Sequence, residues 1–381
     1  MATMEAAMPA ENCIKHPALP VRCLPEREWP KEDREAWQRA RHRGSLLDEG
    51  GLASGWAGST QATSARSYGR WLAFLLNLGI LDRSEYPAER VTKDRIDAYL
   101  ADLRAHGNAS GTIHIRILHL CRMLAVMAPG GCPALLGPIL RMLRAAVRPT
   151  RDDRARLVPA ETLLEVAFSL MDRTDVDSSL SPRLRAVMYR DGLMLAILVS
   201  NALRVGNFAD LELGKSFIQR GEDWWIMLEA SEVKNRKLIN HPVAPELTPR
   251  IHRYLKVWRP VISVLPGEQH GPVSNDTGFL WVGRYGGRFN RKKVRKRIGE
   301  ITLRELGQAL NPHLFRKLQP TELAIHDPAH VGISQVMLGH GSYGTTEKAY
   351  NLARSLDAAR KVQSQLAALR GNTPAIVSKV R

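Results

Sequence analysis

The sequence predicts a mainly α-helical protein with two domains and one small antiparallel β-sheet. Apolar residues recur at helical spacing through most of its 381 residues, a length that suits two domains of ordinary size. Two short strand-like stretches, residues 224–228 and 238–243, flank a polar turn and indicate a β-hairpin. A polar, charged run at 148–156 separates two helical regions. Aromatic residues make up only 6% of the chain, which disfavours an all-β sandwich.

The first domain is expected to be a bundle of four helices. We expect residues 1–57 to form a flexible N-terminal arm with one helix at 30–43, because glycine-rich segments follow that helix. Residues 58–149 carry helical apolar stripes, which are core positions without chemistry. The four expected helices cover residues 64–78, 91–107, a stretch opening at Ser110 or Thr112, and 133–147.

The second domain is expected to span residues 157–371, after a linker at 150–156 and before a tail at 372–381. Most of its patterns are helical, and the hairpin supplies its small sheet. The expected elements are helices at 159–171, 182–201 and 245–258, a buried strand at 279–282, and mainly helical structure from there to residue 370.

The charge of the chain predicts a nucleic-acid partner. The formal net charge is +17 and the pI is about 10.1, so the surface attracts polyanions, with nucleic acid first and an anionic membrane second. The longest apolar run, 193–199, is too short to span a bilayer, and the N-terminus lacks a signal-peptide pattern. We therefore expect a cytoplasmic protein without membrane contact.

Cysteine spacing gives no indication of a metal site. Cys13, Cys23, Cys121 and Cys132 form no CxxC pair, and no histidine lies at zinc-finger spacing from two of them. The sequence also lacks a Walker loop and an acidic metal cluster. We expect reduced thiols, no metal and no cofactor.

A dense basic segment at 284–297 is a candidate for contact with the nucleic-acid backbone. Its charges are too many for one helix face, which is expected where a helix lies against phosphates. The alternative is a solvated or localisation-type patch. The candidate contacts are Arg288, Arg291, Lys292, Lys293, Arg295 and Lys296.

Two upstream positions could act on a phosphate. Arg204 follows the long apolar helix and could present its guanidinium fork to phosphate oxygens; alternatively, it is a helix-end arginine that binds carbonyls. The hairpin tip carries Lys234 and Lys237, either of which could protonate a leaving oxygen, and we prefer Lys234. A soluble charged turn is the alternative reading.

Two downstream residues share one helical face. His313 and Arg316 stand at i and i+3 in His-Leu-Phe-Arg, so together they could grip one phosphate. The motif is unspecific, because another HxxR occurs at 119–122 inside a helix that we interpret as structural. The position of Arg316 just after the basic segment favours the functional reading.

A histidine and a tyrosine follow in the same C-terminal stretch. His340 ends Leu-Gly-His and could face the same phosphate. Tyr350 follows in Thr-Thr-Glu-Lys-Ala-Tyr, and nearby arginines would favour its phenolate as a nucleophile. The alternative is an ordinary core tyrosine on a helix.

The order and spacing of these residues resemble the tyrosine recombinase (phage integrase) family. Arg316 and His340 are 24 positions apart, and Tyr350 lies 10 positions further on, both close to the usual separations in the family. The resemblance covers about residues 157–370, and residues 58–149 resemble the core-binding domain of the family more loosely. The matching set is Arg204, Lys234, His313, Arg316, His340 and Tyr350.

The resemblance implies a site-specific recombinase, integrase or transposase. Tyr350 would attack a DNA phosphate and form a 3′-phosphotyrosyl bond, while Arg204 and Arg316 hold the non-bridging oxygens. A 5′-hydroxyl of a second strand would then attack the phosphotyrosine. The resemblance also implies two domains that clamp double-stranded DNA at a specific site, four protomers in the synaptic complex, and association with the nucleoid.

The remaining three residues would bind the phosphate or move protons. By the same resemblance, His313 assists proton transfer from the tyrosine, Lys234 protonates the 5′-oxygen, and His340 donates a hydrogen bond to the phosphate. The chemistry implied in this way needs neither ATP nor a metal ion.

The sequence departs from the family pattern at three places. Asn207 replaces a frequent acidic residue, Ala202 replaces a frequent glycine, and Pro320 lies in an unusual run after Arg316. These departures keep two alternatives open: a catalytically impaired DNA-binding relative that assists a recombination complex, and a relaxing enzyme similar to type IB topoisomerases.

Overall fold

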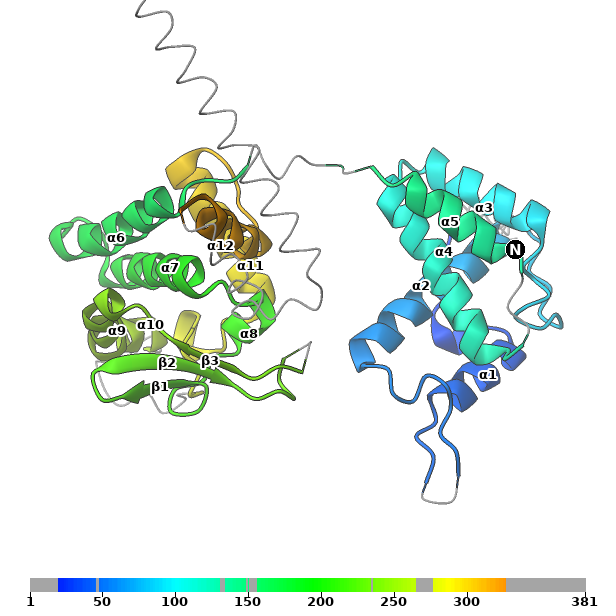
Figure 1. Cartoon of the computed structure of the whole chain (residues 1–381), viewed down its shortest axis with the longest axis horizontal. Helices are drawn as coiled ribbons and strands as arrows, with labels where there is room; N and C mark the ends of the chain where they lie inside the picture. The colour runs from blue at the N-terminus through cyan, green and yellow to red at the C-terminus, as the bar shows by residue number, and fades with distance from the viewer. Residues whose placement is uncertain are drawn as a thin grey trace, which may run out of the picture. The chain divides into compact units, whose positions relative to one another are not determined.

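The computed structural model describes most of the chain, and this part divides into two units, Met1–Arg151 and Asp152–Arg381 (Figure 1). Structural statements below concern each unit by itself. The described residues are 20–45, 48–130, 134–148, 150, 156–233, 236–264 and 277–326, without the side chains of 324–326. Among the helices in these ranges, none combines the length and the apolar character that a membrane crossing requires.

The first unit is helical, as expected. The predicted helix near the N-terminus is present, and Thr92 caps the third α-helix by accepting a hydrogen bond from the Arg95 amide at 3.3 Å. The four expected bundle helices are present as well. The elements are η1 (Glu26–Glu28), α1 (Lys31–Arg41), α2 (Gly58–Asn77), α3 (Lys93–Ala105), α4 (Ser110–Met127) and α5 (Leu136–Ala145).

The expected flexible arm at 1–57 is wrong for the part of it that the structure describes. Trp29 and Trp37 are buried in the core of the first unit, with 2% and 1% exposure. The indole of Trp29 donates to the Leu24 carbonyl at 2.9 Å, and the Leu24 amide donates to the Gly69 carbonyl at 2.8 Å. A Cβ at position 69 would lie 2.3 Å from the Leu24 oxygen, so this close approach requires glycine. The segment that carries α1 is therefore part of the domain.

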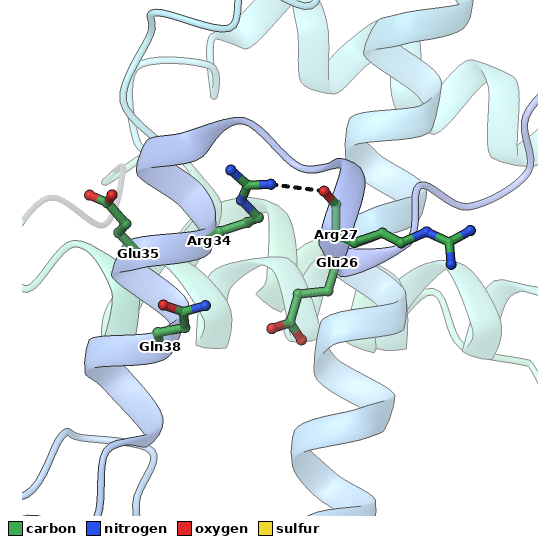
Figure 2. Close-up of a pocket in the computed structure, with 5 residues that line it drawn as sticks. All are labelled: Glu26, Arg27, Arg34, Glu35 and Gln38. Atoms are coloured by element: carbon green, nitrogen blue, oxygen red, sulfur yellow. Dashed lines mark hydrogen bonds between the residues drawn. The ribbon is translucent and has the colours of Figure 1, made fainter.

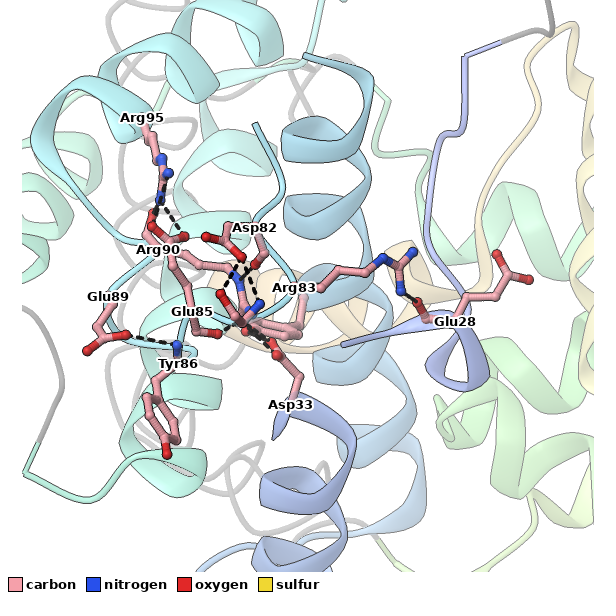
Figure 3. Close-up of polar contacts among 11 residues, drawn as sticks. Glu28, Asp33, Asp82, Arg83, Glu85, Tyr86, Glu89, Arg90 and Arg95 are labelled. Carbon is pink, nitrogen blue, oxygen red and sulfur yellow. Dashed lines mark hydrogen bonds and ion pairs between the residues drawn. The ribbon is translucent and has the colours of Figure 1, made fainter. Parts of the chain in front are cut away.

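A fully buried ion pair fastens α1 to the loop before α3 (Figure 3). Arg90 Nη1 donates to both carboxylate oxygens of Asp33, at 2.8 and 2.7 Å, and the Tyr68 hydroxyl donates to the same carboxylate. Arg90 also donates to the carbonyls of Asp82 and Glu85. Burial raises the pKa of Asp33, and the hydrogen bonds from its two partners oppose that rise. The Asp33 carboxylate and the Arg90 guanidinium are paired with each other and hydrogen-bonded to further groups, which offsets the cost of burying both charges.

The second unit is organised around one buried helix. In α7 (Pro182–Asn201), residues 193–198 are fully buried on every side, which explains why the helix is apolar all round. The Ser181 hydroxyl caps α7 by accepting from the Leu184 amide at 3.4 Å, with Pro182 in the first turn. Helices α6 (Ala160–Val176), α10 (Arg259–Ser263), α11 (Arg291–Leu306) and α12 (Pro312–His326) pack against it.

The sheet of the second unit has three antiparallel strands in the order β1–β2–β3 (Figure 1). The strands are β1 (Phe217–Arg220), β2 (Asp223–Leu228) and β3 (Ile239–Pro242). The predicted hairpin is present as β2 and β3, with Leu228 opposite Ile239. Strand β1 was not predicted. Alternate residues of β2, including Ile226 and Leu228, are buried against the core.

Two other expectations for the second unit differ from the structure in detail. Residues 280–282 are buried as predicted and Phe279 is partly buried, but the stretch forms only isolated bridges, from Phe279 to Glu212 and from Val282 to Arg288, rather than a strand. The expected helix at 245–258 is present, runs on to residue 263, and consists of consecutive pieces of different helix type. These are η2 (Pro245–Leu247), α9 (Thr248–Arg253), a π-helical turn (Tyr254–Trp258, labelled η3) and α10. Pro260 has no N–H for a helical bond to Lys256, and the helix accommodates it beside the π-helical turn without ending.

Candidate active site

A tight turn between two helices presents Arg204. Helix α7 ends at Asn201, and Ala202 then adopts φ 25° and ψ 45°, a conformation that residues with a Cβ rarely adopt. Leu203 is buried, and Arg204 is the N-cap residue of α8 (Val205–Ala209). The guanidinium of Arg204 is partly buried, and burial lowers its pKa. The positive φ also explains why a glycine suits position 202.

Arg316 reaches the same turn from α12. It is only 6% exposed, and its Nη1 donates to the Ala202 carbonyl at 2.7 Å. Burial, followed by the positive charge of Arg204, lowers the pKa of Arg316 to about 10. Two arginines 112 positions apart in the chain therefore lie close enough to repel each other in a partly dehydrated site. Such a pair attracts an anion with several oxygens.

Arg316 binds a carbonyl at the end of α7, the kind of contact that the alternative reading expected of Arg204. The contact with Ala202 uses one of the five N–H groups of the guanidinium and fixes its orientation. Pro320 lies within α12, where it has no N–H for the Arg316 carbonyl, yet the helix continues to His326.

His313 lies one helical turn before Arg316, and its side chain is exposed. The Asn311 side chain accepts from the His313 amide at 3.1 Å and so caps the start of α12. The predicted i, i+3 arrangement of the two residues is therefore confirmed by the helix. The other HxxR motif lies in the first unit, where His119 Nδ1 and the Ser64 hydroxyl share a 2.9 Å hydrogen bond.

Three predicted residues, Lys234, His340 and Tyr350, lie outside the described residues. The structure does describe both sides of the β2–β3 turn. Val233 is 3% exposed and accepts a hydrogen bond from the Arg236 amide at 2.8 Å. Asn207 Nδ2, on α8, donates to the Glu232 carbonyl at 3.3 Å. The turn that carries the predicted lysine is thus attached to the helix that begins after Arg204, and the alternative lysine, Lys237, is exposed.

The basic segment lies beside the same helix. All six predicted backbone-binding residues are exposed, and α11 packs against α8 and α7. Arg288 forms an ion pair with Asp210, at the end of α8, and lies over the Phe279 ring at 4.6 Å. Lys296 pairs with Glu300 at 3.6 Å. The structure therefore connects the predicted phosphate-binding surface to the arginine site through α8.

A buried network that the sequence did not indicate holds α11 against α7. The Asp191 carboxylate is fully buried and accepts from Arg297 Nε at 2.6 Å and from Arg190 Nη2 at 2.7 Å. Arg190 also lies over the Phe289 ring at 4.2 Å. A charged Arg-Asp dipeptide inside a long apolar helix was the signal that could have revealed it.

The first unit has a surface pocket of about 570 Å³, between η1 and α1 (Figure 2). Arg34 donates to the Arg27 carbonyl at 2.9 Å across this pocket. Its lining mixes both signs of charge, so it has no preference for an anion comparable to that of the arginine site. The lining residues are Glu26, Arg27, Arg34, Glu35 and Gln38.

Comparisons with known proteins agree on one family. Residues 170–355 match the model of the phage integrase family. Tyrosine recombinase XerC of Stutzerimonas stutzeri is 27% identical over 158 residues, which cover 42% of this chain and 46% of that protein. The chain thus matches about half the length of such relatives. Tyrosine recombinase XerD of Chlorobaculum tepidum is 25% identical over 336 residues, or 87% of this chain and 96% of that protein.

Solved structures show the same fold. XerH site-specific recombinase, bound to a palindromic difH substrate in a post-cleavage complex, aligns with 92% of this chain and 100% of its own at a TM-score of 0.54 and 15% identity. The Tn1549 transposon integrase, in complex with a circular intermediate DNA, aligns with 86% of this chain and 99% of its own at a TM-score of 0.54 and 15% identity. The predicted fold class, with its two-domain architecture, is confirmed.

Proposed function

Because the chain belongs to the tyrosine recombinase (phage integrase) family, we propose that it cleaves and rejoins DNA strands at a specific site through a 3′-phosphotyrosyl intermediate. The observation that carries this proposal is the convergence of Arg204 and Arg316 at the Ala202 turn. Two guanidinium groups in a partly dehydrated site suit the two non-bridging oxygens of a phosphodiester.

Tyr350 is the proposed nucleophile. Its phenolic oxygen attacks the scissile phosphorus, the bond to the 5′-oxygen breaks, and the enzyme remains attached to the 3′-phosphate. Arg204 and Arg316 hold the non-bridging oxygens, where negative charge develops in the transition state. Burial, followed by the charge of Arg204, lowers the pKa of Arg316, and a bound phosphate opposes both effects, which favours the charged ligand.

Proton transfer is assigned to the other members of the set. We propose that His313 assists removal of the tyrosine proton, that Lys234 gives a proton to the leaving 5′-oxygen, and that His340 donates a hydrogen bond to the phosphate. The exposed position of His313 beside Arg316 supports its role. The attachment of the β2–β3 turn to α8 through Asn207 supports the role of the lysine, with Lys237 as the alternative. A second 5′-hydroxyl then reverses the reaction on the new strand.

The proposed substrate is double-stranded DNA in the cytoplasm, at the nucleoid. The exposed basic residues of 288–296 bind its backbone, residues 58–149 together with the segment that carries α1 form the core-binding domain, and residues 157–371 form the catalytic domain. The segment at 150–156 links the two domains, and a tail follows at 372–381. Four protomers, with or without other recombinase subunits, form the synaptic complex. The DNA-bound state of the XerH and Tn1549 integrase structures supports a DNA partner.

A nicked suicide substrate tests the proposal. On such DNA the 5′-hydroxyl product diffuses away, so the protein–DNA adduct accumulates and survives denaturing electrophoresis. We expect an adduct with the wild-type protein and none with Tyr350→Phe, while DNA binding by that variant is retained. An adduct that persists in Tyr350→Phe would rule out this nucleophile. Salt-sensitive binding without any adduct on cognate DNA would indicate the catalytically impaired alternative, and relaxation of plasmids without a target site would indicate a topoisomerase-like enzyme.

A further inference from the structure

Gln319 lies one helical turn after Arg316 on α12 and reaches the end of α7. Its Nε2 donates to the Val199 carbonyl at 2.9 Å and to the Ser200 carbonyl at 2.6 Å. The last carbonyls of a helix lack partners within the helix and must find them elsewhere. One amide side chain from a helix more than a hundred residues away therefore caps the end of the central helix of the unit.

Three hydrogen bonds from α12 thus clamp residues 199–202. Two come from Gln319, and the third joins Arg316 Nη1 to the Ala202 carbonyl at 2.7 Å. From another side, Asn201 Nδ2 donates to the Pro242 carbonyl of β3 at 2.9 Å. Ala202 has φ 25°, and a strained residue of this kind persists only when its surroundings hold it. The clamp is what holds it.

The clamp acts next to Arg204. Leu203 alone separates the strained residue from this arginine, so a change in the last turn of α7 alters the direction in which the guanidinium leaves the chain. We propose that Gln319 is a positioning residue for Arg204: it fixes the end of α7 and so aims that side chain at the scissile phosphate. The inference rests on the proposed function and adds to it a residue that does not touch the substrate.

A purely stabilising role makes a different prediction. If Gln319 only capped α7, its loss would add to any other defect, whatever the state of Arg204. If it acts through Arg204, its loss matters little once that arginine is already impaired, because residues in one functional unit have non-additive effects. A double-mutant cycle of Gln319→Met and Arg204→Lys separates the two cases.

The experiment measures single-turnover adduct formation on the suicide substrate. Gln319→Met keeps the length of the side chain and removes its donors. We expect a slowing of roughly 10- to 100-fold in the wild-type background, in line with small misplacements of catalytic groups, and less than about 3-fold in the Arg204→Lys background. Gln61→Met in the first unit is the matched control, since Gln61 Nε2 also donates to two carbonyls, of Ala53 and Trp56, at 3.2 and 3.3 Å.

A neutral methylphosphonate at the scissile position gives an independent readout. It removes the negative charge that Arg204 faces. Misplacement of Arg204 should therefore reduce the rate of adduct formation less on this substrate than on the phosphodiester. If Gln319→Met unfolds below the assay temperature, Gln319→Asn replaces it, because the shorter amide keeps its polarity but loses its reach.

The outcomes separate the inference from the proposed function. Equal slowing in both arginine backgrounds, no slowing in either, or the same slowing with Gln61→Met would overturn the role of Gln319 in positioning. A wild-type protein that forms no adduct would instead remove the proposed function itself. A non-additive cycle together with a smaller loss on the methylphosphonate supports the inference.

Discussion

Neutralising two lysines at the start of α11 should weaken the salt dependence of DNA binding by a defined amount. Lys292 and Lys293 are exposed and form no ion pair with any residue that the structure describes, whereas Arg288 pairs with Asp210 and Lys296 pairs with Glu300. These two lysines can therefore bind a phosphate without first losing an ion pair to a described carboxylate. They should therefore contribute fully to the release of counterions from DNA.

The magnitude follows from the number of contacts. Each phosphate neutralised by the protein adds about 0.9 to the slope of log K against log salt for duplex DNA. The double variant Lys292→Gln, Lys293→Gln should thus lower the slope by about 1.8. Between 50 and 200 mM salt, the wild-type protein should lose roughly 12-fold more affinity than the variant, since the salt concentration changes fourfold.

Fluorescence anisotropy of a labelled duplex over this salt range measures the slope. Lys256→Gln is the matched control, because Lys256 is an exposed lysine of the same unit in the π-helical turn. Arg288→Gln should lower the slope by less than one lysine does, since its guanidinium already has Asp210 as a partner. An unchanged slope in the double variant, or an equal drop with the control, would refute the placement of DNA against the start of α11.

Two further substitutions test the first unit. Asp33→Ala leaves the Arg90 charge buried without its carboxylate and should lower the free energy of unfolding by about 3 to 5 kcal/mol, whereas Glu35→Ala, which removes an exposed pair, should cost less than about 1 kcal/mol in the same urea titration. Comparable losses would contradict the account of the buried pair. Burial lowers the pKa of His119, so the unfolded chain binds more protons below its usual pKa of about 6.5, and stability falls as the pH drops through that range. His119→Gln, which can still bond to Ser64, should show a smaller drop in Tm between pH 7 and pH 5; an identical drop would exclude His119 as its source.

Local sequence patterns were sufficient to predict much of the secondary structure. They did not predict contacts between residues that are far apart in the chain. The helices of both units and the β2–β3 hairpin followed from apolar spacing. The pairing of Arg204 with Arg316 followed only from the order of residues in a family, since neither position is distinctive alone. The contacts of Gln319 with α7 have no local signature at all, because a side chain that binds carbonyls far along the chain leaves no periodicity.

The prediction of a flexible N-terminal arm was wrong for a related reason. The prediction of a flexible arm relied on the glycines and prolines of this segment and neglected Trp29 and Trp37. Burying these two large aromatic side chains contributes more free energy than ordering the glycines and prolines costs. Strand β1 has four residues and was too short for its alternation to be recognised. In each case the tertiary contact, rather than the local preference, decided the structure.

The burial of these tryptophans affects how deletion mapping of this protein should be interpreted. A shortened chain that begins at residue 58 lacks α1 and both indoles, so the newly exposed face of Tyr68 and of the core around it would make the fragment prone to aggregation. Loss of DNA binding in such a fragment would result from a destabilised domain, and would not show that the deleted residues contact DNA. Point substitutions on the surface of an intact chain are the informative route to the role of its N-terminal region.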